Sequence, residues 1–260
     1  MNASTPHSSE RHESRQAEAA SEDYLLNPTL DREKLARDFS LNRRIHIPDF
    51  LAPAGAERLF AHLRHRQEWR LVINEGEKLF ELDRSAQAAL TAEQKTQLDT
   101  AIYQRARHGF QFRYETIRVP DLEADRASEA SPLAEFARFL SSERSLRFLR
   151  SLTGHSDIRF ADAHATAYGP HHFLTAHDDA VEGKNRVAAY VFNLTADWRA
   201  DWGGLLMFHG RDGHVDQAFT PRFNALNIFE VPQPHSVSYV APFVPYRRYA
   251  VTGWLRSSER

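Results

Sequence analysis

The feature that most constrains the fold of this chain is a set of three potential metal ligands, His177, Asp179 and His235. Alternation along an extended segment would place His177 and Asp179 on one side and Asp178 on the other. His235 follows His177 by 58 positions, with several strand-like runs between them. All three can bind one ion only if a distant strand folds back over the first pair. Two imidazoles and one carboxylate on one side of an iron(II) ion leave coordination positions open for chemistry.

The His-x-Asp pattern is weak by itself, because it occurs at residues 155–157, 177–179 and 214–216. The first pair follows Gly154 after a helical pattern, so a helix end and the start of a strand explain it. The last pair lies in the turn-like segment 211–214, only 21 residues before His235. The central pair is therefore the candidate, although a lone motif of this kind is more often structural.

The segment Arg248 to Trp254 has the pattern of a strand, in which side chains alternate between two faces. One face carries Arg248, Ala250, Thr252 and Trp254. The planar fork of arginine suits bidentate binding of a carboxylate, which lysine does not offer. This face is predicted to line a pocket that receives an anion, with an exposed arginine at a strand end as the structural alternative.

Together with their neighbours, these motifs resemble the 2-oxoglutarate- and iron(II)-dependent oxygenases, specifically the prolyl hydroxylase-like branch. The resemblance covers about residues 158–257 and rests on elements that occur in order. They are Ala167-Tyr168-Gly169-Pro170, His177-x-Asp179, Arg186 before the apolar run Val187 to Phe192, Asp197-Trp198, Gly203-Gly204-Leu205-Leu206, the apolar strand Phe223 to Phe229, His235, and Arg248 to Trp254. The resemblance implies a mostly β fold with flanking helices and a double-stranded β-helix, or jelly-roll, core with the metal at its open mouth.

The resemblance implies that His177, Asp179 and His235 bind iron(II), and that Arg248 anchors the distal carboxylate of 2-oxoglutarate. Tyr168 corresponds to a tyrosine that contacts this cosubstrate near the metal, with a core aromatic residue as the alternative interpretation.

The chain departs from the family pattern at two positions near the anchor. Asn193 stands where prolyl hydroxylases often have a second tyrosine, with Tyr190 three residues earlier. Ala250 replaces a serine found in many relatives, so Thr252 is the nearest hydroxyl on the face of Arg248. On the substrate side, Arg186 corresponds to a residue near the substrate entrance, or else is a solvated strand end, and Trp254 is a second candidate to face the substrate.

The implied activity is hydroxylation of a C–H bond with iron(II), 2-oxoglutarate and O2, with ascorbate as an additional reductant to consider. The branch favours a prolyl residue in a protein or peptide, and a small-molecule substrate stays open because fold analogy does not decide it. Two alternatives remain: a cupin-like metalloenzyme that works without 2-oxoglutarate, and a non-catalytic jelly-roll binding module. Binding of 2-oxoglutarate that depends on the metal would separate them.

Composition sets the remaining bounds. With 260 residues, 42% of them hydrophobic, the chain can bury a substantial core. The lack of cysteine excludes disulfides and thiolate metal sites, which fits a cytoplasmic location. The net charge of -2 gives no electrostatic footprint for nucleic acid, and no apolar run approaches the ~20 residues needed to span a membrane.

The chain is predicted to consist of a disordered tail, residues 1–23, and a single oxygenase domain, residues 24–260. The tail contains no Leu, Ile, Val or aromatic residue. In the domain, a mixed helical and stranded part, 24–156, precedes the jelly-roll core, 157–257. Helices are expected at Asp31 to Phe39, Ala52 to Arg66, Ser85 to Leu90, Thr91 to Arg107 and Ser131 to Leu152, and strands at Arg44 to Ile47, Trp69 to Asn74 and Lys78 to Leu82.

The aromatic residues Phe110, Phe112 and Tyr114 alternate along the chain. A half-buried strand is the favoured interpretation of this pattern. A mobile segment that grips a substrate over the active-site mouth is the alternative.

Overall fold

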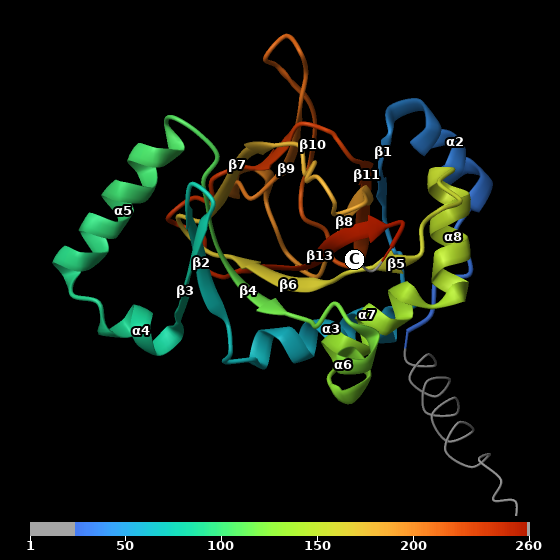
Figure 1. Ribbon diagram of the computed structural model, residues 1–260, viewed down its shortest axis with the longest axis horizontal. Helices are drawn as coiled ribbons and strands as arrows, with labels where there is room; N and C mark the ends of the chain where they lie inside the picture. Colours follow the sequence, from blue (N-terminus) through green and yellow to red (C-terminus); the bar gives the residue numbers. More distant parts are fainter. Residues whose placement is uncertain (1–23, 259–260) are drawn as a thin grey trace, which may run out of the picture.

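Strands from all parts of the chain pair into one strongly curved sheet that nearly closes into a barrel (Figure 1). The computed structural model describes residues 24–258, so the predicted disordered tail, 1–23, lies outside the described residues. Within this part, thirteen strands belong to the sheet. They are β1 (Arg44–Ile47), β2 (Arg70–Glu75), β3 (Lys78–Asp83), β4 (Phe112–Arg118), β5 (Phe160–Ala161), β6 (His164–Tyr168), β7 (Phe173–His177), β8 (Arg186–Asn193), β9 (Leu206–His209), β10 (Val215–Phe219), β11 (Ala225–Glu230), β12 (His235–Val237) and β13 (Arg248–Arg256).

The order of the main strands is β1-β11-β8-β13-β6-β4-β7-β12-β9-β10, and neighbours along it run antiparallel. Strand β4 joins the two halves, because it pairs with β6 through Glu115 to Arg118 and with β7 through Phe112 and Arg113. The predicted jelly-roll core with flanking helices is therefore confirmed.

The alternating pattern of the strands separates an interior that lines a cavity from an exterior that packs on helices. On β13, Val251 and Leu255 are buried in the main hydrophobic cluster, whereas Arg248 and Thr252 border the cavity. The same core cluster holds Phe192 of β8. Because side chains on a strand alternate between faces, one strand serves both the packing of the fold and the site.

Seven helices lie outside the barrel in the described part of the chain (Figure 1). They are α2 (Arg32–Asn42), α3 (Pro53–His65), α4 (Arg84–Ala89), α5 (Ala92–Ala106), α6 (Glu123–Ser128), α7 (Pro132–Ser141) and α8 (Glu143–Thr153), with a short 3-10 turn at Ala200–Trp202. Buried side chains of α3, α7 and α8 belong to the same hydrophobic cluster as β8 and β13. No helix within residues 24–258 is long and apolar enough to cross a membrane.

The predicted helices and strands in residues 31–107 are present to within three residues at each end. Helix α5 begins with a capping box, in which Thr91 accepts a hydrogen bond from the Gln94 backbone and the Gln94 side chain accepts one from the Thr91 backbone.

The predicted continuous helix from Ser131 to Leu152 is wrong, because Ser142 divides it into α7 and α8. Ser142 is extended, with φ -67° and ψ 149°. Its backbone N–H donates to the Phe139 carbonyl, and its hydroxyl accepts from Ser145 N–H, so the residue ends one helix and caps the next. Helix α6 was not predicted from the sequence.

Candidate metal centre

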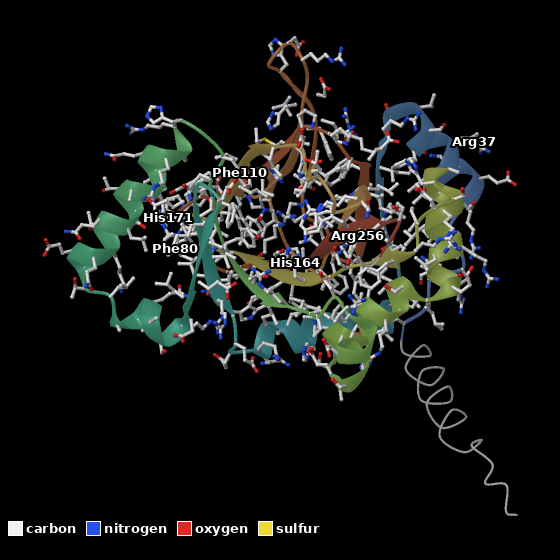
Figure 2. All side chains as sticks on the ribbon, viewed as in Figure 1. Arg37, Phe80, Phe110, His164, His171 and Arg256 are labelled. Atoms are coloured by element: carbon white, nitrogen blue, oxygen red, sulfur yellow. The ribbon has the colours of Figure 1, made fainter. Side chains whose placement is uncertain are left out.

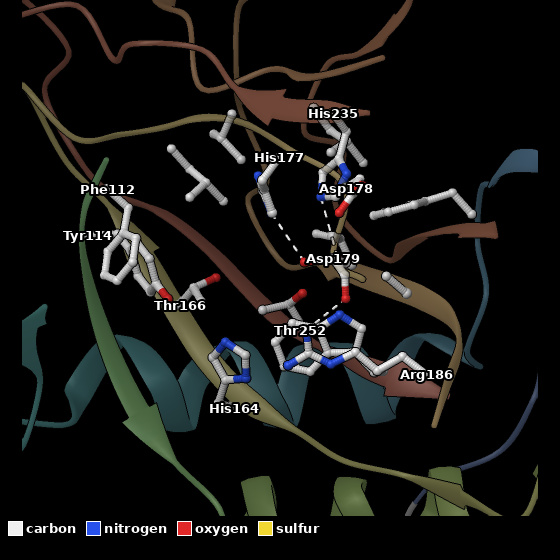
Figure 3. A pocket seen from close by; sticks show the side chains of 18 of the residues that line it. Phe112, Tyr114, His164, Thr166, His177, Asp178, Asp179, Arg186, His235 and Thr252 are labelled. Atoms are coloured by element: carbon white, nitrogen blue, oxygen red, sulfur yellow. Dashed lines mark hydrogen bonds and ion pairs between the residues drawn. The ribbon is translucent and has the colours of Figure 1, made fainter. Parts of the chain in front are cut away.

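The three predicted ligands converge at one mouth of the barrel (Figure 3). His177 ends β7 and His235 begins β12, and the two residues face each other directly in the antiparallel register. The Nε2 atom of His177 lies 3.2 Å from Oδ1 of Asp179, and that of His235 lies 3.5 Å from Oδ2. The three potential ligand atoms all lie within 4.8 Å of one another.

The position of Asp179 does not result from the alternation of side chains along a strand. Strand β7 ends at His177, and Asp179 has a left-handed backbone with φ of 64°. Such a conformation is uncommon for a residue with a side chain and is concentrated at functional sites. Asp178 was expected to face away, but it also borders the cavity, and its carboxylate accepts a hydrogen bond from Ala180 N–H at 3.0 Å.

The hydrogen bonds of the two imidazoles suit metal binding. The Nδ1 atom of His177 lies 3.0 Å from the Thr175 carbonyl, and that of His235 lies 2.8 Å from the Gln233 carbonyl. A carbonyl can only accept, so each Nδ1 carries the proton and each Nε2 directs its lone pair towards Asp179. Backbone partners of this kind fix the tautomer and orientation of histidines that bind metals.

Charge considerations show that a cation fits between these atoms. Burial lowers the pKa of His235 to about 4, so its ring is neutral near pH 7. Burial alone would raise the pKa of Asp179, but the adjacent imidazoles of His177 and His235 hold it below its ordinary value. Two lone pairs and a carboxylate that face one another repel unless a positive charge lies between them. The donor set of two imidazoles and one carboxylate matches iron(II) with open positions.

The triad borders a cavity of about 420 Å³ that also contains the predicted anchor, Arg248. This side chain is 2% exposed. It donates to the Gly204 carbonyl at 2.8 Å and to Oδ1 of Asn193 at 3.2 Å, and its Nε has no partner among the described residues. Gly204 has a φ of 64°, a conformation that favours glycine.

The guanidinium of Arg248 is a buried charge without a carboxylate partner in residues 24–258. Burial lowers its pKa to about 10, which still leaves it positive at neutral pH. A buried charge is costly unless it is paired. The arrangement therefore suits an anion that enters the cavity.

Tyr168 and Thr252 both line the same cavity. Tyr168 is opposite Arg248 in the β6–β13 register, and its ring centre lies 5.4 Å from the guanidinium carbon. Burial raises its pKa, so the phenol stays neutral. The Thr252 hydroxyl donates to the Tyr190 carbonyl at 2.8 Å. Tyr190 itself points out of the cavity and donates to the Asp162 carbonyl at 2.7 Å.

The two residues expected on the substrate side, Arg186 and Trp254, contact each other and both border the cavity. The Arg186 guanidinium carbon lies 3.5 Å from the Trp254 ring centre, which is a close cation–π contact. Arg186 also donates to the backbone carbonyl of Asp179 at 2.9 Å. The nearby indole of Trp254 also helps to hold the pKa of Asp179 below its ordinary value.

Three aromatic residues form one wall of the cavity, and the favoured interpretation of residues 110–114 as a half-buried strand agrees with β4 from Phe112 on. Phe112 and Tyr114 belong to strand β4, while Phe110 lies in the loop before it, with its ring 5.1 Å from that of His177. Successive ring centres in this wall are 5.6 and 5.5 Å apart, and Tyr114 stacks on Tyr168.

The sequence candidates did not include His164 and Thr166, two polar residues that line the cavity. His164 lies on β6 and is half-buried, whereas Arg37 is exposed at the periphery (Figure 2). The signal was present, because residues 164, 166 and 168 share one face of a strand and Tyr168 was already a candidate.

The histidines outside the central pair have other surroundings. His155 follows α8 and lies 2.9 Å from Glu230, whereas His214 is exposed at the tip of the β9–β10 hairpin. His172 is buried and accepts a hydrogen bond from Gly169 N–H, and His171 bonds to Tyr239. Among the described residues, only the central triad forms a cluster that could hold a metal.

Residues 163–256 match the family model described as the 2OG-Fe(II) oxygenase superfamily. No curated protein matches the sequence. Among solved structures, the chain is similar to a prolyl-4-hydroxylase of Pseudomonas putida, with 18% identity, a TM-score of 0.56, and coverage of 86% of this chain and 98% of the other.

Two further structures support the same fold. A 2OG-Fe(II) oxygenase family oxidoreductase from Burkholderia pseudomallei has 13% identity and a TM-score of 0.57 over 88% of this chain and 92% of the other. A prolyl hydroxylase from Trichoplax adhaerens, in complex with a peptide fragment of the hypoxia inducible factor oxygen degradation domain, has 16% identity and a TM-score of 0.53, over 94% and 93%.

The matched segment carries the whole ligand triad and Arg248 on a jelly-roll of this class. Residues 163–256 are thus similar to the 2OG-Fe(II) oxygenase superfamily, and the fold is similar to that of prolyl hydroxylases.

Proposed function

We propose that this protein is a 2-oxoglutarate- and iron(II)-dependent oxygenase, which uses O2 to hydroxylate a C–H bond of a prolyl residue in a peptide or protein. The observation that carries the chemistry is the presence, in one cavity, of the triad and of a buried arginine without a carboxylate partner. Similarity to two prolyl hydroxylases, one of them in complex with a peptide, supports the choice of substrate. The aromatic wall of Phe110, Phe112 and Tyr114 suits a compact apolar ring such as that of proline.

In this proposal, His177, Asp179 and His235 hold iron(II), and Arg248 binds the distal carboxylate of 2-oxoglutarate. When bound, the metal allows oxidative decarboxylation of 2-oxoglutarate to succinate and carbon dioxide, which supplies the oxidising power for hydroxylation. The guanidinium is held in place before the anion enters, because the Gly204 carbonyl and Asn193 fix it. Such preorganisation reduces the entropy lost on binding.

The remaining residues of the cavity position the two organic molecules and exclude water. Tyr168 covers Arg248 with an aromatic ring, and Thr252 lies on the same face of β13. Both are proposed to contact the cosubstrate. Arg186 and Trp254 are proposed to contact the substrate at the rim. A reductant such as ascorbate and a cytoplasmic location stay predictions from the sequence.

The experiment that tests the cosubstrate site is an anaerobic titration of the iron(II)-loaded protein with 2-oxoglutarate. Chelation of the metal by the keto and carboxylate oxygens should give a visible charge-transfer absorption band. The His177→Ala protein is the control, and it should give no band. A band that appears only with the intact triad supports the proposal.

The two alternatives give different results in this titration. Iron that binds without any band on addition of 2-oxoglutarate would favour a cupin-like metalloenzyme that works without this cosubstrate. A protein that binds neither iron nor 2-oxoglutarate would favour a non-catalytic binding module. The buried, unneutralised Arg248 speaks against both, because its charge is costly without an anion.

A further inference from the structure

A second, polar hollow of about 710 Å³ adjoins the metal cavity. Four residues border both spaces, namely Tyr114, His164, Arg186 and Trp254. We call these four residues the neck. The neck includes Arg186, whereas Arg248 borders the metal cavity alone. A molecule that reaches the metal through the neck would pass His164.

His164 is the one histidine of the neck, and its ring makes no hydrogen bond to another residue between 24 and 258. In contrast, the Nδ1 atoms of His172, His177 and His235 each form a hydrogen bond with the backbone. The His164 ring instead packs beside Trp254, with ring centres 5.9 Å apart. Burial lowers its pKa to about 4, so the ring is neutral and offers one donor and one acceptor.

His164 is half-buried and borders both spaces, so a molecule in the neck can reach its ring nitrogens. Such a group can exchange its hydrogen bonds with water for hydrogen bonds with a ligand. The neighbouring strand does not use the His164 ring. Thr252 is opposite His164 in the β6–β13 register, but its hydroxyl donates to the Tyr190 carbonyl instead. The ring is therefore available to whatever occupies the neck.

The two spaces differ in chemistry in a way that indicates the kind of molecule. The metal cavity is lined mainly by apolar and aromatic side chains. The second hollow is bordered by charged residues of both signs, among them Arg118, Asp121, Lys184 and Arg256. A substrate with an apolar part at the metal and a polar continuation would match both. A compact apolar molecule would leave the second hollow unused.

We propose that His164 contacts the substrate, and that its ring nitrogens bond backbone amide groups of an extended substrate that spans the neck from the metal cavity into the polar hollow. Successive amides of such a chain offer N–H and carbonyl groups for the acceptor and the donor of a neutral imidazole. This inference rests on the proposed function and adds a specificity-determining residue to it. It also requires that the substrate extend beyond the oxidised group, as a peptide does.

The test uses a mixture of N-acetylated, C-amidated decapeptides with a central proline and random flanks, and N-acetylproline amide as a short probe. Oxidation is measured by mass spectrometry with the full-length, iron-loaded protein. His164→Leu removes both polar atoms at similar volume, and His164→Asn keeps a donor and an acceptor. The matched control is His214→Leu, which removes an exposed histidine at the hairpin tip.

We expect the decapeptides to be oxidised better than the short probe. His164→Leu should raise the KM for the best peptide about tenfold or more, since two neutral hydrogen bonds are lost. His164→Asn should recover part of this loss, and His214→Leu should behave as the unchanged protein. In all variants the 2-oxoglutarate absorption band should form at the same concentration, which shows that the variant is folded and that kcat effects do not arise from the cosubstrate site.

The outcomes separate the failure of this inference from that of the proposed function. Oxidised peptides with an unchanged KM in His164→Leu would overturn the role of His164 while leaving prolyl hydroxylation in place. A normal absorption band without any oxidised peptide would remove both the peptide substrate and this role. Loss of the band in the unchanged protein would refute the 2-oxoglutarate site itself.

Discussion

The metal cavity contains two arginines, Arg248 and Arg186, and the same type of side chain lies in a different environment at each end of the site. Both donate to backbone carbonyls, of Gly204 and Asp179 respectively, and neither has a carboxylate within ion-pair distance in residues 24–258. Their surroundings differ. Arg248 is 2% exposed, whereas Arg186 lies half-buried on Trp254 at the rim.

The two ends therefore differ in what they can bind. The enclosed end admits a small anion of fixed size, which is what a cosubstrate shared by every turnover requires. The end with Arg186 continues into the polar hollow, so it can receive a larger partner. Both guanidiniums are positive, so the difference between their proposed roles comes from how far each side chain is buried and not from its charge. Substitutions at each end show whether the two ends bind their ligands independently.

The largest effect is expected from the metal ligands between the two ends. His177→Ala should lower turnover by more than about a hundredfold, because even outer partners of metal ligands cost 10- to 100-fold when removed. The measurement is succinate production at saturating iron and 2-oxoglutarate. His155→Ala, which changes another His-x-Asp histidine, serves as the control and should retain activity. Full turnover in the His177 variant would remove this residue from the metal site.

At the enclosed end, Arg248→Ala should raise the 2-oxoglutarate concentration needed for half-maximal turnover by about 10- to 100-fold, since charge-assisted hydrogen bonds are lost. Arg248→Lys should recover only part of this, because lysine cannot form the planar fork. Titration of 2-oxoglutarate at fixed peptide measures the effect. An unchanged requirement for 2-oxoglutarate would refute the anchor assignment.

At the open end, Arg186→Gln should raise the KM for the peptide about tenfold and leave 2-oxoglutarate affinity within about twofold. The reason is that its contacts are with Trp254 and the Asp179 backbone, on the substrate side of the triad. Separate titrations of peptide and cosubstrate distinguish the two. If both constants rose together, the division between the two ends would be wrong.

The last effect concerns stability and comes from Asp162, which borders the polar hollow. Burial raises the pKa of this carboxyl to about 6, from an ordinary value of 3.8. Since the unfolded chain loses its proton first, the free energy of unfolding should fall as the pH rises from about 4 to about 6. The expected decrease is on the order of 2 kcal/mol.

Urea denaturation at several pH values measures this decrease, and Asp162→Asn should flatten it. The carboxylate also accepts the Trp254 backbone N–H at 2.7 Å and lies 3.4 Å from Arg256, so an asparagine oxygen can keep the first contact. The same pH slope in the variant would show that another group is responsible.

The sequence was most informative where alternation decides position. The faces of β13 and β6 followed from parity, so the cavity side of Arg248, Thr252 and Tyr168 could be predicted. Asp179 reached the predicted place by a left-handed backbone that parity does not describe. The polar hollow could not be predicted, because β4, β6, β8 and the loops around them meet there only after the barrel has formed.

The two-faced pairing of β13 has a consequence for how chains of this kind can change in length. Inserting one residue into the strand Arg248–Arg256 would shift its register by one. Side chains that now line the cavity would then point towards the helices, in the place of Val251 or Leu255. Gly253 adds a second restriction, since a Cβ there would lie 2.1 Å from the Asp162 carbonyl oxygen. Insertions and deletions should therefore accumulate at places such as the projecting β9–β10 hairpin (Figure 1), and not in the last strand.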